Sequence, residues 1–225
     1  MSMNKAELTQ RETYVQQRYL RWRTMVVPFA YKGKKGERIA EIIRTTGGMP
    51  SLVVEIGVGP GGVARSVSQS GARVVGMDLS AEALGRAREH CRDADVRLLR
   101  GSGFALPFAD RSVPVVYASQ VLHLFDAQGR LALMREVRRV LQPGGRFIFD
   151  MKNVATHAWR FASSPAEKKA RNFPGDREIR RLLEEVGFGS TMVRAGLFPV
   201  FGMSLGTDAG ALCALAHTRF YVARS

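Results

Sequence analysis

LVVEIGVGPGG, residues 52–62, joins a short apolar run with an acid next to its end to a turn dense in glycine. Leu52 to Ile56 has the apolar, β-branched character of a strand buried on both faces of a parallel sheet. The glycines after it permit backbone angles that a side chain would forbid, so the backbone can approach a ligand closely. A helix is expected from about Pro60, with its unpaired amides aimed at that ligand. The stretch predicts a strand–turn–helix unit that binds a cofactor.

An acid at the end of the next strand fits the same unit. Residues 73–77 are predicted to form a strand, and Asp78 follows it directly. Its distance from the glycine turn is usual for an acid that binds ribose, and a carboxylate can accept hydrogen bonds from two sugar hydroxyls.

Two cofactors compete for this turn. Gly57, Gly59 and Gly62 also satisfy the dinucleotide fingerprint G-x-G-x-x-G, so their spacing leaves an NAD-dependent oxidoreductase as an alternative. Glu55 separates the two, because a carboxylate beside the turn repels a pyrophosphate but suits the ammonium and sulfonium of S-adenosylmethionine (SAM). We therefore expect SAM, with S-adenosylhomocysteine as its product.

The rest of the chain alternates strands and helices, as a doubly wound α/β sheet requires. Strands are predicted near 52–56, 73–77, 96–100, 113–118, 145–151, 191–195 and 217–223. Helices are predicted near 61–70, 80–91, 126–141 and 176–187. Residues 1–46 are expected to form an N-terminal helical cap on a single domain spanning 47–225. Within it, the long and almost uncharged segment 196–216 is expected to be a substrate lid or a subunit contact, although ordinary core packing explains it equally well.

Composition excludes several classes of protein. At 225 residues and 45% hydrophobic, the chain can bury the core of one enzyme-sized domain. Cys91 and Cys213 lie far apart and have no ligand-like neighbours, so neither a disulfide framework nor a metal site is expected. There is no apolar signal core and no long uncharged apolar run, so a cytoplasmic protein without a membrane span is expected.

The large excess of basic over acidic residues has two interpretations. A net charge of +14 attracts nucleic acid, anionic lipid or acidic small molecules, which keeps an RNA methyltransferase open as an alternative. Much of the charge, however, is arginine scattered along predicted helices, which is equally typical of a solvated surface. The denser cluster at residues 32–35 is expected to be a flexible basic loop near the site entrance.

Three further stretches give the chain a family resemblance. GSGFALPF at 101–108 is similar to the pattern G-D-A-E-x-L-P-F, VVYASQVLHLF at 115–125 resembles a fourth strand with its exit, and LQPGG at 141–145 resembles the entry to a fifth strand. In this order, over roughly residues 50–190, the motifs resemble the small-molecule branch of the class I SAM-dependent methyltransferases, of methyltransferase type 11 or ubiquinone-biosynthesis-like kind. The resemblance implies a Rossmann-like, mostly parallel seven-stranded sheet with a C-terminal antiparallel hairpin.

The resemblance also implies a cofactor pocket. The methionine end of SAM would lie against Glu55, Gly57, Gly59 and Gly61, the ribose against Asp78, the adenine against Leu79, Ser102, Gly103 and Phe104, and the sulfonium against Ser119 and Gln120. Here the chain departs from the family, because Ser102 stands where an aspartate usually accepts the adenine amino hydrogens and Phe104 replaces a glutamate. A neutral hydroxyl binds more weakly than a carboxylate.

Methyl transfer from SAM is an in-line displacement in which the protein mainly places the reactants, and this placement is worth roughly 7–11 kcal/mol. A base is needed only where the acceptor loses a proton. The candidate bases are His123 and His157, each of which can also be read as a packed histidine. Tyr14, Tyr19, Tyr31 and Trp159 are candidate acceptor contacts.

The sequence thus predicts a methyltransferase acting on an oxygen or nitrogen of an aromatic or acidic metabolite, of the kind found in natural-product biosynthesis. No N-P-P-Y or D-P-P-Y tetrapeptide follows the fourth strand, which argues against the branches that methylate amide or adenine nitrogens. A SAM-binding regulator without turnover remains a further hypothesis. A monomer or a homodimer is expected.

Overall fold

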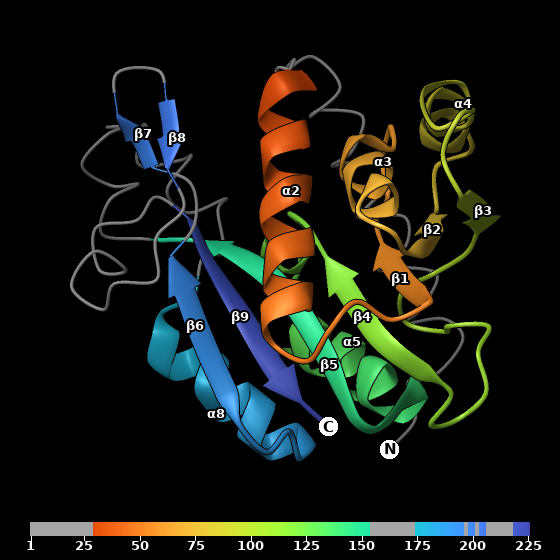
Figure 1. Ribbon diagram of the computed structural model, residues 1–225. Helices are drawn as coiled ribbons and strands as arrows, with labels where there is room; N and C mark the ends of the chain where they lie inside the picture. Colours follow the sequence, from red (N-terminus) through yellow and green to blue (C-terminus); the bar gives the residue numbers. More distant parts are fainter. Residues whose placement is uncertain (1–28, 154–173, 196–197, 201–202, 206–217) are drawn as a thin grey trace.

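The computed structural model describes residues 29–153, 174–195, 198–200, 203–205 and 218–225 (Figure 1). One seven-stranded sheet runs through them in the order β3-β2-β1-β4-β5-β9-β6. Its strands are β1 Leu52–Ile56, β2 Arg73–Asp78, β3 Val96–Arg100, β4 Val113–Ala118, β5 Leu141–Lys152, β6 Thr191–Ala195 and β9 Thr218–Arg224. The first five strands are parallel, and β9 runs antiparallel to both β5 and β6. The predicted doubly wound sheet with an antiparallel end is confirmed.

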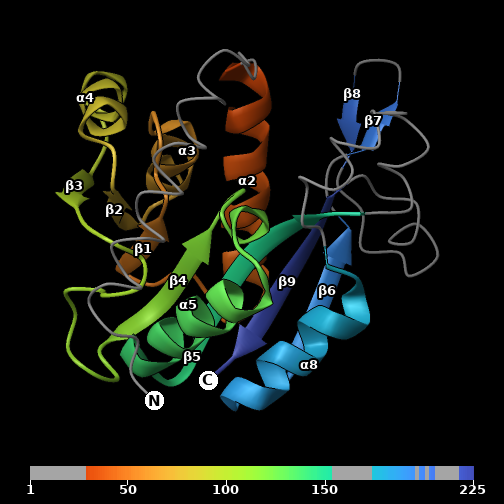
Figure 2. The ribbon, with the colours of Figure 1, turned by 180° about the vertical axis from the view of Figure 1, so that it is seen from behind.

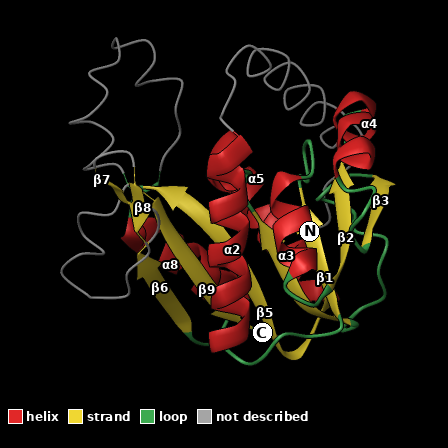
Figure 3. Cartoon of the chain, turned by 45° about the horizontal axis from the view of Figure 1, so that its top comes forward, coloured by secondary structure: helices red, strands yellow, loops and turns green. Residues whose placement is uncertain are grey.

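Helices cover both faces of this sheet. The helices α2 Phe29–Thr45, α3 Gly62–Gln69 and α4 Ala81–His90 lie on one side, and α5 Ala127–Val140 and α8 Asp176–Val186 lie on the other (Figure 2). With the top of the molecule tilted forward, the strands are seen between the two helical layers (Figure 3). Two hydrophobic clusters, one on each face, hold the layers together because the central strands are buried on both sides.

Helix α2 belongs to the layer that contains α3. Its apolar side chains Ile39, Ile42 and Ile43 share one cluster with Val53 and Phe220 of the sheet. The prediction of a flexible basic loop at residues 32–35 is wrong, since these residues lie within the helix. A basic run is compatible with a helix when its apolar positions recur at helical spacing, as they do after Arg38. The remainder of the predicted cap, residues 1–28, lies outside the described residues.

Two arginines fasten the end of α2 to the sheet. Arg146 in the middle of β5 donates to the carbonyls of Ile43 and Gly48, and Arg224 at the end of β9 donates to the carbonyl of Thr46. Burial lowers the pKa of Arg146, and the nearby charge of Arg224 lowers it further. The C-terminal end of α2 is therefore fixed to the sheet, and its N-terminal half is directed to the carboxyl ends of the parallel strands (Figure 1).

Part of the predicted lid is described. Within 196–216, β7 Phe198–Val200 and β8 Met203–Leu205 pair antiparallel as a separate two-stranded ribbon. The remaining residues of that segment lie outside the described ones. Among the described helices, none combines the length and apolar character needed to cross a membrane.

Candidate functional site

The glycine turn after β1 depends on left-handed backbone. Gly57, Gly59 and Gly61 have φ of +73°, +53° and +83°, a region that other residues enter only at a cost. A Cβ on Gly57 would lie 2.5 Å from Cγ2 of Val121, and one on Gly61 would lie 2.6 Å from Sγ of Cys91. Apart from Gly59 itself and its two chain neighbours, no heavy atom lies within 4 Å of the position for a Cβ on Gly59. The turn is therefore packed at both ends and open at its middle.

Asp78 ties the end of β2 to this turn. Its Oδ2 accepts a hydrogen bond from the Gly59 amide at 2.9 Å, and its Oδ1 accepts one from the Ser80 amide at 2.9 Å. Burial raises the pKa of Asp78, and the bonds from Ser80 and Gly59 offset part of that rise. Each carboxylate oxygen has a second lone pair, so the group can still accept from two ribose hydroxyls.

Glu55 and Tyr117 form a buried pair under the turn. They are register partners on the adjacent strands β1 and β4, and the Tyr117 hydroxyl donates to Glu55 Oε2 at 2.8 Å. Their exposures are 1% for Glu55 and 0% for Tyr117. Burial first, and then the charge of Glu55, raise the pKa of Tyr117 well above its ordinary value, so the hydroxyl keeps its proton. Sequence reasoning missed the role of Tyr117. The one signal for it was the presence of a side-chain hydroxyl in a strand whose other residues are aliphatic.

Cys91 fills the space beside the turn. Its thiol lies 3.4 Å from the Gly61 carbonyl, and burial together with the charge of Glu55 raises its pKa to about 11. A thiol that stays protonated is a poor nucleophile and a poor metal ligand. In the described part of the chain, no group of His, Cys, Asp and Glu side chains is arranged to hold a metal ion.

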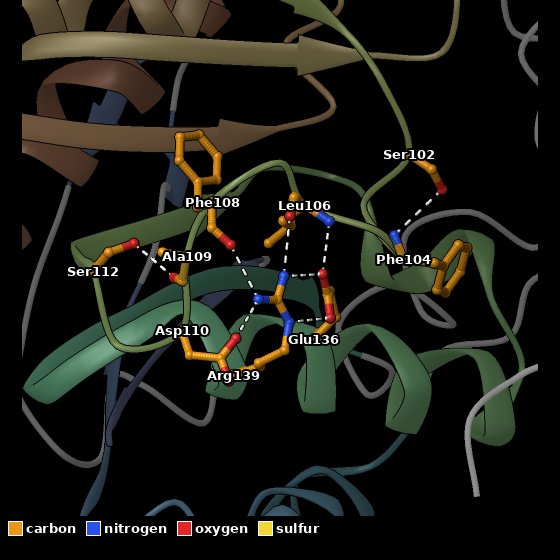
Figure 4. A network of polar contacts seen from close by, with 9 residues as sticks. All are labelled: Ser102, Phe104, Leu106, Phe108, Ala109, Asp110, Ser112, Glu136 and Arg139. Carbon is orange, nitrogen blue, oxygen red and sulfur yellow. Dashed lines mark hydrogen bonds and ion pairs between the residues drawn. The ribbon is translucent and has the colours of Figure 1, made fainter.

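The predicted adenine segment makes its own contacts. Ser102 is buried, and its Oγ accepts a hydrogen bond from the Phe104 amide at 3.3 Å (Figure 4). The Phe104 ring packs edge-on against Phe125, with centroids 5.0 Å apart. A Cβ on Gly103 would lie 2.8 Å from Cγ2 of Ile56, which holds the segment close to the end of β1. Leu79, after β2, is partly exposed.

Arg139 and Glu136 of α5 anchor the loop that follows this segment (Figure 4). Glu136 Oε1 accepts from the Leu106 amide at 2.6 Å, and Arg139 donates to the carbonyls of Leu106 and Phe108, each at 3.0 Å. Arg139 also pairs with Glu136 at 2.7 Å and with Asp110 at 2.6 Å, and these carboxylates raise its pKa. In the sequence Arg139 was indistinguishable from the scattered surface arginines.

The exit of β4 is held by a second carboxylate. The Gln120 amide donates to Asp150 Oδ1 at 2.6 Å, and Lys35 Nζ of α2 lies 2.7 Å from Asp150 Oδ2. Ser119 and Gln120, the predicted sulfonium contacts, are both partly buried here. Asp150 was not singled out from the sequence, and Lys35 was predicted only as part of a basic loop at residues 32–35.

The structure describes only some of the predicted bases and acceptor contacts. His123 lies in the 3₁₀ turn Leu122–Leu124 with 4% of its surface exposed, close after the exit of β4. His157, Trp159, Tyr14 and Tyr19 lie outside the described residues. Tyr31 lies near the start of α2, and its side chain is not among those described.

Comparisons with known proteins show which families of sequence the chain is similar to. Residues 54–149 match a family described as "Methyltransferase domain". The demethylmenaquinone methyltransferase of Chlorobaculum tepidum is 35% identical over 127 residues, which cover 55% of this chain and 46% of that protein. The ubiquinone biosynthesis O-methyltransferase of Sodalis glossinidius is 29% identical over 153 residues, which cover 65% of this chain and 60% of that protein. The chain thus spans about half the length of these relatives.

A solved structure covers more of the chain. It is a SAM-dependent methyltransferase of Thermotoga maritima, described as a "possible histamine N-methyltransferase". It superposes with a TM-score of 0.65 at 19% identity, over 95% of this chain and 97% of that one. Sequence relatives also include an enzyme named for methylation of carbon, the rice 24-methylenesterol C-methyltransferase 2.

Proposed function

Because this chain belongs to the class I SAM-dependent methyltransferases of small molecules, we propose that it transfers the methyl group of SAM to an oxygen or nitrogen of a metabolite. The observation that carries the proposal is the hydrogen bond between Asp78 and Gly59, since it sets a ribose-binding carboxylate against an open glycine turn. Buried Glu55 beside that turn favours a cationic cofactor over a diphosphate.

The described residues fit SAM in three parts. Asp78 would accept from the ribose hydroxyls, Glu55 would face the ammonium of the methionine end, and Ser102 with Phe104 would border the adenine. SAM supplies a methyl group already activated by a positive sulfur. The work left to the chain is to hold donor and acceptor in line and to exclude water, which is why positioning contacts dominate the site.

For the acceptor we propose an aromatic or acidic metabolite. Two relatives are named for demethylmenaquinone and for ubiquinone biosynthesis, which supports an aromatic acceptor. Of the predicted cap 1–46, the part before α2, residues 1–28, would close over the acceptor together with the predicted lid 196–216, whereas α2 packs on the sheet beside α3. His123 or His157 would accept a proton where the acceptor is a phenol or an alcohol. The position of His123 after the β4 exit, which carries Ser119 and Gln120, supports it as a candidate base.

Calorimetry tests the cofactor first. S-Adenosylhomocysteine is expected to bind the full chain, whereas NAD is expected not to. The reverse result would make the chain a nicotinamide-binding protein.

Transfer of a labelled methyl group from SAM to phenols and carboxylates then tests the acceptor. If turnover stays at background across both sets while a carbon acceptor is methylated, the choice of oxygen or nitrogen is wrong. If no acceptor of any kind reacts, the SAM-binding regulator is the better hypothesis.

RNA is the second candidate acceptor, and the net charge of +14 favours it. Arg97 and Arg100 add exposed cations on the edge strand β3. An RNA methyltransferase would bind RNA with an affinity that falls steeply with salt, because bound cations release counterions from phosphates. Filter binding between roughly 50 and 200 mM salt distinguishes this steep loss of affinity from absent or salt-independent binding.

A further inference from the structure

Helix α2 brings a lysine into a buried position at the carboxyl edge of the sheet. Lys35 Nζ and Asp150 Oδ2 lie 2.7 Å apart, and only 2% and 3% of the two side chains are exposed. Asp150 stands two residues after Ile148 in β5, and the side chain of Ile148 packs in the cluster that includes α2. Because alternate residues of a strand share one face, Asp150 projects from the face of the sheet that α2 covers. A buried ion pair gains little net stability, since the loss of hydration offsets the attraction. This pair therefore calls for a role other than stability.

The other oxygen of Asp150 holds a strained backbone. The Gln120 amide donates to Asp150 Oδ1 at 2.6 Å, and Gln120 has a φ of +59°. Among the described residues, Arg111 is the one other non-glycine residue with positive φ. Left-handed backbone is unfavourable for a side chain with a Cβ, and it persists where the surroundings enforce it. Here the enforcing contact is a hydrogen bond to a buried carboxylate.

The strained turn touches the cofactor turn. Val121 follows Gln120 and packs against Gly57. A Cβ on Gly57 would lie only 2.5 Å from Cγ2 of Val121. The strands before the two turns are neighbours, with Ile56 opposite Ala118. A shift of the Gln120 turn would therefore displace the backbone at the methionine end of the cofactor site.

We propose that Asp150 is a positioning residue for methyl transfer: held by Lys35, it fixes the Gln120 turn beside the sulfur of the bound cofactor. This inference rests on the proposed function, because SAM is the ligand whose sulfur the turn would face. Lys35 acts through Asp150, so one cation of the basic run on α2 lies inside the protein.

Two charge-neutral double variants separate the hydrogen bond from the ion pair. Lys35→Met with Asp150→Asn keeps a carbonyl that can accept from the Gln120 amide, whereas Lys35→Met with Asp150→Leu keeps the size and removes the acceptor. Neither leaves a lone buried charge, so both are expected to fold. Calorimetry on each gives the Kd for SAM and for S-adenosylhomocysteine, and hydrogen exchange reports the Gln120 amide.

The leucine variant is expected to weaken SAM about tenfold more than S-adenosylhomocysteine, because only SAM carries the sulfonium methyl that the turn faces. Its Gln120 amide is expected to exchange at least about tenfold faster than in the wild type. The asparagine variant is expected to show a smaller change in both measurements. A purely structural role would weaken both ligands equally in both variants, and that result would overturn the proposal.

A glycine at position 120 gives an independent test. Glycine adopts positive φ without help, so in a Gln120→Gly background the leucine variant is expected to change the ratio of the two Kd values less than about threefold. An undiminished effect in that background would also overturn the proposal. As a control, Arg130→Met with Glu178→Gln removes a pair 2.9 Å apart between α5 and α8 and is expected to leave the ratio unchanged. A wild type that fails to bind S-adenosylhomocysteine would instead refute the proposed function, before any variant is compared.

Discussion

Asp78 reaches the glycine turn across 19 residues of chain, whereas Asp150 reaches Lys35 across 115. The first contact lies within one strand–helix–strand unit, so a spacing rule for that unit predicts it. The second joins the end of the fifth strand to a helix that precedes the first, and no local spacing describes it. The comparison separates the proposed cofactor side of the site, with Glu55, residues 57–61 and Asp78, from the proposed positioning side, with Gln120, Asp150 and Lys35. Ligand recognition can follow a motif while positioning depends on the whole fold.

The largest effect is expected from Asp78→Ala on the cofactor side. It removes the acceptor for the ribose hydroxyls and for the Gly59 amide, and bonds to charged groups are worth about 1.5–3 kcal/mol each. The Kd for S-adenosylhomocysteine, measured by calorimetry, should rise roughly a hundredfold. Asp95→Ala removes an exposed carboxylate that pairs with Arg73 and serves as the control. A change below about threefold for Asp78→Ala would remove the ribose assignment.

The same carboxylate makes binding dependent on pH. Burial raises the pKa of Asp78, so it takes up a proton at a higher pH than an exposed aspartate does. Only the ionised form offers both oxygens to the ribose, so affinity for S-adenosylhomocysteine should fall on acidification before ordinary aspartates titrate. Calorimetry in steps from neutral pH downward follows this loss. Asp78→Asn, which cannot ionise, should show a flatter profile, and parallel profiles for the two proteins would assign the titration to another group.

Gly57→Ala tests the contact between the two sides. Its Cβ would lie 2.5 Å from Val121 on backbone with φ of +73°, so both overpacking and strain oppose it. We expect a loss of about 2–4 kcal/mol in the free energy of unfolding, measured with urea. Gly144→Ala has a nearly equal φ of +74° and open space around it, and it should lose only about 1 kcal/mol. Equal losses would show that Val121 moves aside, which would uncouple the two sides.

Tyr117→Phe sharpens the assignment of the cofactor side. It removes one hydroxyl from a fully buried pair and leaves Glu55 less well placed for an ammonium. The Kd for S-adenosylhomocysteine should rise roughly tenfold, which corresponds to about 1.4 kcal/mol. Methylthioadenosine lacks the amino acid tail, and its Kd should stay the same. Tyr221→Phe, another buried tyrosine, is the matched control. An equal loss for both ligands would mean that Tyr117 supports the fold and does not act through Glu55.

The smallest effect is expected at Cys91, beside the glycine turn. With a pKa raised to about 11, its thiol is protonated at pH 8, so a Cys213→Ser variant should resist alkylation while folded. Mass spectrometry after iodoacetamide treatment, with and without urea, measures this. Fast labelling of the folded protein would show that the turn opens without denaturant.

Spacing and residue chemistry predicted the strands and helices of the sheet closely, because buried parallel strands and capped helices carry local signals. Ser80 and Asp126 cap α4 and α5 as such residues do elsewhere. The prediction failed at residues 32–35, where charge suggested a loop and the apolar positions further along favoured a helix. The periodicity of apolar residues is the stronger signal. Burial of an apolar stripe stabilises a helix more than repulsion between neighbouring charged side chains destabilises it.

By itself, the sequence determined the order of strands and helices, the left-handed glycine turn and the acid that faces it. Each of these depends on residues close together in the chain and on steric rules that hold in any fold. Only the tertiary structure decided that Tyr117 supports Glu55, that Arg139 anchors the loop after Ser102, and that Asp150 joins Lys35 to the Gln120 turn. These partners come from different strands and helices. They meet only after the sheet and its helices have assembled and excluded water from between them.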